Sequence, residues 1–126
     1  MYYKKFEDIP VWQISRKFVS DIYKLIDKNV RLKRDFSLCD QLKRATYSVP
    51  LNIAEGFERS SNKEFANFIN IAKGSAGEVR TIVYILLDND YINKKEAEEL
   101  LKELHNISSH LSHFRSYLIK NFEHKR

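Results

Sequence analysis

The first half of this 126-residue chain carries an excess of Lys and Arg, the residue types that bind polyanions. Residues 1–63 hold 13 Lys and Arg against 8 Asp and Glu, whereas residues 64–126 hold 9 of each. Because Lys and Arg neutralise phosphates, this one-sided charge indicates either a nucleic-acid partner or an ordinary solvated face. The candidate phosphate-contacting residues are Arg16, Lys17, Lys24, Lys28, Arg31, Lys33, Arg34, Lys43 and Arg44.

A second group of polar residues recurs every three or four positions within residues 41–59. On a helix they fall within an arc of about 80°, directly beside the apolar arc that forms the core. Polar groups at the edge of a core are partly desolvated and need hydrogen-bond partners. We therefore expect either an internal network, in which Arg44 or Arg59 pairs with Glu55, or contact with a neighbouring subunit or ligand. The stripe comprises Gln41, Arg44, Ser48, Asn52, Glu55 and Arg59.

The patterns of common catalytic and metal sites are missing from the sequence. No Glu is followed three positions later by His, as a di-iron bundle requires. His110 and His113 lie one helical turn apart without a matching ligand, and Arg115 lacks the His four to six residues later that is typical of helical-bundle ribonucleases. Cys39 has no His nearby and is expected to pack as a small apolar residue. The sequence therefore predicts no enzymatic activity, no metal and no cofactor.

The aromatic residues are expected to pack in the core rather than to stack on nucleic-acid bases. Most of them fall on the apolar stripes of predicted helices. The residues in question are Phe18, Tyr23, Phe65, Phe68, Tyr84 and Phe114.

Helix start and stop signals divide the chain into four long helices. Pro10 lies in the first turn of the first, Ser37 is the predicted cap of the second, and Ser61 and Asn93 begin capping boxes for the third and fourth. Pro50 predicts a kink or local opening in the second helix. The predicted helices cover about 8–29, 38–58, 62–89 and 94–121, with a basic connector at 30–34. Short connections favour one domain over residues 1–126, an all-α antiparallel up-down-up-down four-helix bundle.

Two glycines interrupt the predicted third helix, which costs helix stability unless something compensates. Gly74 and Gly77 are expected to let a neighbouring helix or the polar stripe approach closely. Ile71, Ile82 and Ile85 lie away from the main core stripe, and apolar surface that one bundle leaves uncovered favours self-association.

Composition indicates a protein of a reducing compartment. The chain is 43% hydrophobic and 31% charged, with a single Cys that excludes an internal disulfide framework. It has no run approaching ~18 apolar residues, and acidic residues occur where a signal peptide needs its apolar core. We expect a cytoplasmic protein with no membrane partner.

Three stretches resemble one bacterial family. These are residues 40–61 (DQLKRATYSVPLNIAEGFERSS), residues 63–65 (KEF) and residues 71–78 (IAKGSAGE), and the early Val11-Trp12-Gln13 matches as well. Over residues 6–92 the chain resembles the four-helix-bundle proteins encoded by intervening sequences inside 23S rRNA genes. Thr46, Tyr47 and Gly77 depart from the family pattern, which puts the helix packing there in question.

The resemblance implies a homo-oligomer, a pentamer in characterised relatives, without established enzymatic activity. A related branch serves as the accessory protein of diversity-generating retroelements, in which a basic pentamer binds nucleic acid and the reverse transcriptase. The family signature, read as a polar network or subunit interface, falls on Gln41, Arg44, Ser48, Pro50, Asn52, Glu55, Gly56, Arg59, Gly74, Ser75 and Glu78.

Two functions follow as hypotheses. In the first, the protein is a non-enzymatic homo-oligomer that binds the backbone of structured RNA or DNA through the basic residues. In the alternative, it is an adaptor that presents Arg44, Glu55 and Arg59 to a protein such as a polymerase, without binding nucleic acid.

Overall fold

Helices account for nearly all of the computed structural model, which describes residues 3–122. A single 3-10 turn, η1, precedes five α-helices, and the described residues contain no β-strand. The elements are η1 (Phe6–Asp8), α1 (Pro10–Lys28), α2 (Val30–Arg34), α3 (Phe36–Phe57), α4 (Asn62–Asp88) and α5 (Lys94–Lys120). The prediction of an all-α helical bundle is confirmed.

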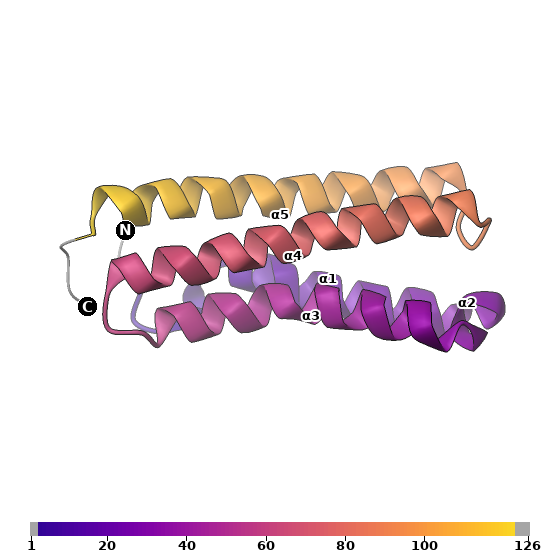
Figure 1. Cartoon of the computed structure of the whole chain (residues 1–126), viewed down its shortest axis with the longest axis horizontal. Helices are drawn as coiled ribbons and strands as arrows, with labels where there is room; N and C mark the ends of the chain where they lie inside the picture. Colours follow the sequence, from indigo (N-terminus) through magenta and orange to yellow (C-terminus); the bar gives the residue numbers. More distant parts are fainter. Residues whose placement is uncertain (1–2, 123–126) are drawn as a thin grey trace.

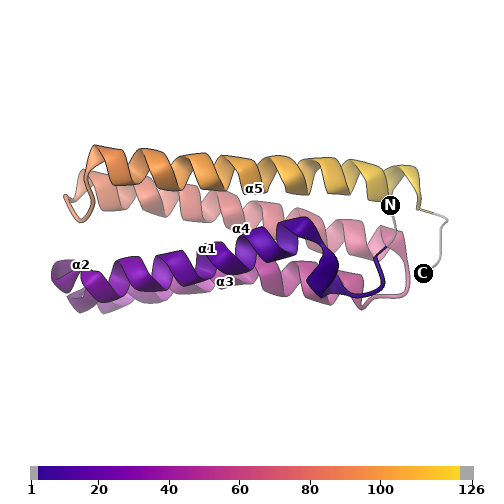
Figure 2. The same ribbon diagram turned by 180° about the vertical axis from the view of Figure 1, so that it is seen from behind.

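The four long helices alternate in direction along the bundle (Figure 1). Helix α1 lies beside α3, α3 beside α4, and α4 beside α5, and both views agree on this arrangement (Figure 2). The short helix α2 turns the chain from α1 into α3 at one end, and the α4–α5 turn lies at that same end. This layout places the basic first half of the chain on one pair of helices, α1 and α3, and on their connection.

Side-chain caps set most of the helix boundaries. Asn29 accepts from the backbone N–H of Leu32 and starts α2, so the predicted connector at 30–34 is a helix. Asp35 accepts from the N–H of Leu38, and α3 therefore begins at Phe36, two residues before the expected start and without Ser37 as its cap. Asn93 and Glu96 form the predicted capping box at the start of α5.

Helix α4 starts with a capping arrangement that differs in one bond from a full box. The hydroxyl of Ser61 accepts from the Glu64 N–H, as predicted. The Glu64 carboxylate, however, accepts from the hydroxyls of Ser60 and Ser61.

Pro50 lies inside α3, which continues unbroken to Phe57, so the predicted opening does not occur. A proline removes only one backbone hydrogen bond directly. Val49 and Ile53 on either side are buried in the core, and that packing holds the helix together across the missing bond. The side-chain amide of Asn52 donates to the Ser48 carbonyl rather than to that of Thr46, the carbonyl whose partner Pro50 removes.

Aromatic rings close the end of the bundle where α3 meets α4. Phe57 and Phe65 meet edge-to-face with centroids 6.0 Å apart, and Phe65 meets Phe114 of α5 at 5.2 Å. Phe6 of η1 packs on Trp12 at 5.2 Å. Such pairs add about 0.5–1.5 kcal/mol each beyond the area they bury, so they tie the N-terminal turn to α3, α4 and α5.

The glycine that the packing requires is Gly56, not the two in α4. A Cβ at Gly56 would lie 2.7 Å from both Phe65 Cδ1 and Phe68 Cβ, so only glycine allows α3 this close to the start of α4. A Cβ at Gly74 or Gly77 would meet nothing within 4 Å. Within the chain, neither a neighbouring helix nor the polar stripe therefore comes close enough to require glycine at these two positions.

The uncovered apolar surface of α4 is smaller than the sequence predicts. Ile71 and Ile85 are exposed, but Ile82 is buried in the core. Ile82 therefore belongs to the hydrophobic core and not to the surface of α4.

Among the described residues, no helix is long and apolar enough to cross a membrane.

We expect Gly56→Ala to lower the free energy of unfolding by about 1–3 kcal/mol, because the added methyl overpacks the contact with Phe65 and Phe68. Gly77→Ala is the matched control. It fills open space within a helix and should raise stability by about 0.5–1 kcal/mol. Urea denaturation of both variants measures the difference, and equal effects of the same sign would contradict this account of α3–α4 packing.

Candidate functional site

The predicted phosphate-contacting residues lie on α1, α2 and α3, and all but the half-buried Lys43 are exposed. On α1, Lys17, Lys24 and Lys28 fall within about 40° of one another at about 100° per residue, so they share one face of the helix. Arg31, Lys33 and Arg34 follow on α2 at the end of the bundle. The first half of the chain thus forms a basic surface over α1 and its connection to α3.

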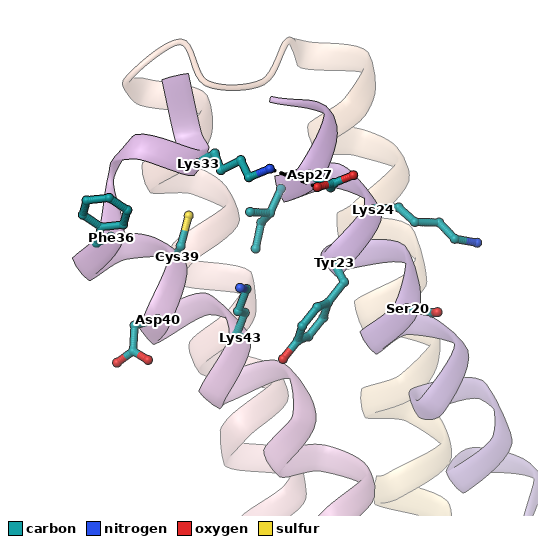
Figure 3. A pocket seen from close by; sticks show the side chains of 10 residues that line it. Ser20, Tyr23, Lys24, Asp27, Lys33, Phe36, Cys39, Asp40 and Lys43 are labelled. Atoms are coloured by element: carbon teal, nitrogen blue, oxygen red, sulfur yellow. Dashed lines mark hydrogen bonds and ion pairs between the residues drawn. The ribbon is translucent and has the colours of Figure 1, made fainter. Parts of the chain in front are cut away.

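A groove with a volume of ≈ 780 Å³ lies between α1 and α3 below α2 (Figure 3). Tyr23 and Lys24 come from α1 and Lys33 from α2, whereas Phe36 and Lys43 come from α3. A second groove of ≈ 710 Å³ continues along α1, shares Tyr23 and Lys24 with the first, and adds Arg16 and Lys17. The remaining lining residues of the first groove are Ser20, Ile26, Asp27, Cys39 and Asp40.

Three of the basic side chains are partly neutralised by carboxylates. Lys17 pairs with Asp21 at 2.8 Å, Lys33 with Asp27 at 3.1 Å, and Arg44 with Asp40 at 2.9 Å. These hydrogen bonds raise the pKa of Lys17 and of Arg44. Exposed pairs of this kind contribute little stability, about 0–1 kcal/mol, and open readily to another anion.

The other six of the nine predicted phosphate-contacting residues form no ion pair with a carboxylate among residues 3–122. Two of them contact aromatic rings instead: the Arg16 guanidinium lies 5.6 Å from the Trp12 ring centroid, and the Lys43 ammonium lies 5.0 Å from that of Tyr23. Cations held on rings keep their full charge for a ligand. The six are Arg16, Lys24, Lys28, Arg31, Arg34 and Lys43.

Arg31 is held in place by the α4–α5 turn. Its guanidinium lies 4.8 Å from the Tyr91 ring centroid and donates to the Asp90 carbonyl at 3.3 Å. The Tyr91 hydroxyl in turn donates to Asp35 at 2.8 Å, and Asn29 donates to the Tyr91 carbonyl at 2.6 Å. This cluster links the two halves of the bundle and fixes the orientation of α2.

Hydrogen bonding to the Asp35 carboxylate raises the pKa of Tyr91 above its ordinary value of 10.0, since an ionised phenol cannot donate to a carboxylate. Nearby Arg31 opposes this shift by favouring the phenolate. The Tyr91–Asp35 contact is therefore intact at neutral pH.

The polar stripe of α3 meets α4 along part of its length. The hydroxyls of Ser48 and Ser75 lie 2.9 Å apart, and the Asn52 amide donates to the Ser48 hydroxyl at 2.9 Å. Gln41 donates to Glu78 at 3.0 Å nearer the other end of the stripe. The seam between α3 and α4 is thus a hydrogen-bonded network within one chain.

The charged members of the stripe lie outside that network and are exposed. Arg59 pairs with Glu55 at 2.8 Å, one of the pairings that the sequence allows, and its guanidinium lies 4.7 Å from the Phe68 ring centroid. Arg44 pairs with Asp40 and does not line the groove in which Lys43 lies.

An exposed stripe on α4 follows heptad spacing. Ile71, Gly74, Glu78, Thr81 and Ile85 are separated by alternating steps of three and four residues, the a/d pattern by which helices pair. Ile71 is 51% and Ile85 40% exposed, and Gly74 faces open space. Glu78 in the middle of this α4 stripe accepts from Gln41 of α3, so the stripe borders the α3–α4 seam, and its exposed apolar residues are Ile71 and Ile85.

Two exposed aromatic residues differ from the sequence expectation, and a third, Phe36, was not singled out by the sequence. Tyr23 is 41% and Tyr84 53% exposed, although the sequence predicts core packing for both. Phe36, at 80% exposure, has the highest value among the large hydrophobic side chains of the described residues. The cap at Asp35 places Phe36 in the first turn of α3, so its side chain projects beyond the core. In the sequence Asp35 is the signal for this helix start, but Ser37 is an alternative cap and was predicted instead.

The surroundings of Cys39, His110 and His113 are those of packed or surface side chains. The Cys39 thiol is buried, donates to the Leu32 carbonyl at 2.9 Å, and has a pKa raised by burial, which confirms that it packs as a small residue. His110 and His113 line a small apolar pocket with Tyr3 and Tyr117. Among residues 3–122, no three His, Cys, Asp or Glu side chains gather closely enough to hold a metal ion.

The chain is similar to a known family over most of its length. The profile described as 23S rRNA-intervening sequence protein matches residues 7–113. A crystal structure of a protein with unknown function from the S23 ribosomal protein family, from Bacteroides thetaiotaomicron, has a TM-score of 0.78 and 25% sequence identity. That similarity covers 84% of this chain and 95% of the other. None of the curated proteins compared with the chain matches it.

We expect Tyr91→Phe to lower stability at neutral pH and to make it less sensitive to alkali. A raised pKa in the folded state stabilises the protein below the ordinary value of 10.0, and this contribution is lost as the pH rises through the folded pKa. Urea midpoints measured between about pH 8 and about pH 11 test this. Tyr84→Phe, on the exposed side of α4, is the control, and an identical pH dependence of both variants would contradict a role for the Tyr91–Asp35 bond.

Proposed function

The chain belongs to the family of 23S rRNA-intervening sequence proteins, and from this premise we propose that it is a non-enzymatic, homo-oligomeric protein that binds nucleic acid. The resemblance seen in the sequence is confirmed at the level of the family. Kinship with the accessory proteins of diversity-generating retroelements, a pentameric assembly and a cytoplasmic location are part of this proposal.

One observation supports nucleic-acid binding above the others. Six of the predicted phosphate-contacting residues on α1, α2 and α3 have no carboxylate partner within residues 3–122, and three of them, Arg16, Lys24 and Lys43, line two connected grooves. These six cations are not neutralised by a carboxylate, and a phosphate backbone releases counterions when it binds such cations. The two grooves together are lined by Arg16, Lys17, Lys24, Lys33 and Lys43.

The exposed α4 stripe supports self-association. The glycine between the two isoleucines allows another helix backbone to come close. In a monomer, Ile71 and Ile85 expose apolar side-chain area to water. The stripe lies on α4, whereas the basic residues lie on α1, α2 and α3. Assembly through α4 therefore leaves the basic surface accessible and repeats it in every copy.

Reversing the charge of α2 tests the binding. The variant Arg31→Glu/Lys33→Glu/Arg34→Glu should bind structured RNA and duplex DNA more than about tenfold more weakly at ~50 mM salt. The slope of log affinity against log salt concentration should be smaller by about one unit for each phosphate that the variant no longer neutralises. Fluorescence anisotropy measures both quantities. Circular dichroism verifies the fold, because Arg31 also contacts Tyr91.

The matched control reverses three exposed basic residues of α4, Lys63, Lys73 and Arg80, and should retain wild-type affinity. If the wild type binds neither RNA nor DNA at ~50 mM salt, nucleic-acid binding is wrong, because electrostatic affinity is near its strongest there. The adaptor function, with Arg44, Glu55 and Arg59 exposed for a protein partner, then becomes the better hypothesis.

Self-association is tested by Ile71→Glu/Ile85→Glu, which places two like charges on the α4 stripe and should convert the assembly to a monomer at micromolar concentration. Ile119→Glu on α5 is the control, since Ile119 is similarly exposed but lies off the stripe. Sedimentation velocity gives the mass. A wild-type protein that is monomeric under these conditions would contradict the homo-oligomer.

A further inference from the structure

The groove between α1 and α3 combines aromatic walls with cations, which plain phosphate binding does not need. Phe36 stands on the α3 side and Tyr23 on the α1 side (Figure 3). Both rings are in contact with water, at 80% and 41% exposure, although the chain buries most of its other large apolar side chains. An exposed ring at the mouth of a groove offers a flat apolar face to a ligand.

Three lysines line the same groove as these rings. Lys43 lies over the Tyr23 ring, between α3 and α1, and Lys33 reaches across the upper end toward Asp27 (Figure 3). The Lys24 ammonium points outward from α1 at the outer edge. A ligand with a planar aromatic part against Phe36 and negative charges on either side would satisfy both kinds of group.

The acidic residues of the groove narrow the choice of ligand. Asp27 and Asp40 are exposed and keep lone pairs beyond those that Lys33 and Arg44 occupy. Carboxylates repel phosphates as they repel acidic peptides and headgroups, but they also accept hydrogen bonds from the amino groups of nucleic-acid bases, which acidic peptides and headgroup phosphates do not offer in a planar aromatic ring. The combination therefore favours a nucleotide with its base inside the groove and its phosphates at the lysines.

The base must be unpaired to fit this arrangement. In a duplex both faces of each base are covered by its neighbours, so a side-chain ring reaches a base face only in a single strand, loop or bulge. Proteins that bind single strands combine a basic groove that follows the backbone with aromatic rings on which bases stack. The second groove, with Arg16 and Lys17, continues the basic path along α1.

We propose that the α1–α3 groove is a binding site for an unpaired segment of RNA or DNA, with one base stacked on Phe36 and the flanking phosphates on Lys24, Lys33 and Lys43. This rests on the proposed nucleic-acid binding and adds to it the kind of strand and the place of one base. The volume of ≈ 780 Å³ lies within the range of about 300–1,000 Å³ that is usual for ligand pockets.

The test compares two labelled strands of about 12 nucleotides, one with all its bases and one with abasic sites at the centre, which carry the same phosphates. Wild-type protein should bind the complete strand about tenfold more tightly, the effect of stacking one base. Phe36→Ala should lose this preference and leave the affinity for the abasic strand unchanged. Lys43→Gln should weaken the binding of both strands, and parallel RNA and DNA titrations identify the preferred nucleic acid.

Tyr84→Ala is the matched control, because Tyr84 is an exposed aromatic residue on α4, away from the groove, and its removal should change neither affinity. Equal binding of the complete and abasic strands by the wild type would overturn the base site while leaving backbone binding intact. Failure of both strands to bind would overturn the proposed function as well. A poly-glutamate peptide that binds the wild type but not Phe36→Ala would overturn the site in favour of a protein partner.

Discussion

The close packing of α3 on α4 is the constraint on which the rest of the structure depends. At one end Gly56 brings the α3 backbone against the side chains of Phe65 and Phe68, and near the middle Ser48 and Ser75 bring two hydroxyls to 2.9 Å. A larger residue at any of these contacts would separate the helices and expose the seam to water. Because the two helices meet so closely, Gln41, Ser48 and Asn52 have hydrogen-bond partners within the chain, and the α1 side of α3 and the exposed side of α4 are left for other contacts.

Those two sides have different chemistry. The α1 side of α3 carries the groove with Tyr23, Phe36 and Lys43, and the outer side of α4 carries Ile71 and Ile85 at heptad spacing. An assembly built on the second surface would present several copies of the first. Multiple weak sites on one particle bind a long strand far more tightly than each binds alone, since every further contact after the first is intramolecular. Self-association and nucleic-acid binding therefore reinforce one another in the proposed function.

The helices are predictable because their signals are local. Pro10, Ser61 and Asn93 mark helix starts within a residue or two of those observed, since a cap acts on amides only two or three positions away. The same locality explains why the helix boundaries between residues 30 and 37 were predicted wrongly: Asn29, Asp35 and Ser37 are three possible caps within one short stretch. The sequence also predicts a kink or opening at Pro50, but packing around it offsets the missing bond, and the strength of packing is not a local property.

The sequence by itself determined the all-α class, the positions of the long helices and the concentration of positive charge before residue 63, because periodicity, caps and charge counts are properties of neighbours along the chain. Only the tertiary structure decided which groups meet. It buried Ile82 and left Gly74 open, and it brought Phe36 of α3 and Tyr23 of α1 to the same groove. Such contacts join residues far apart in sequence and depend on the distance between helices, which one-dimensional spacing does not contain.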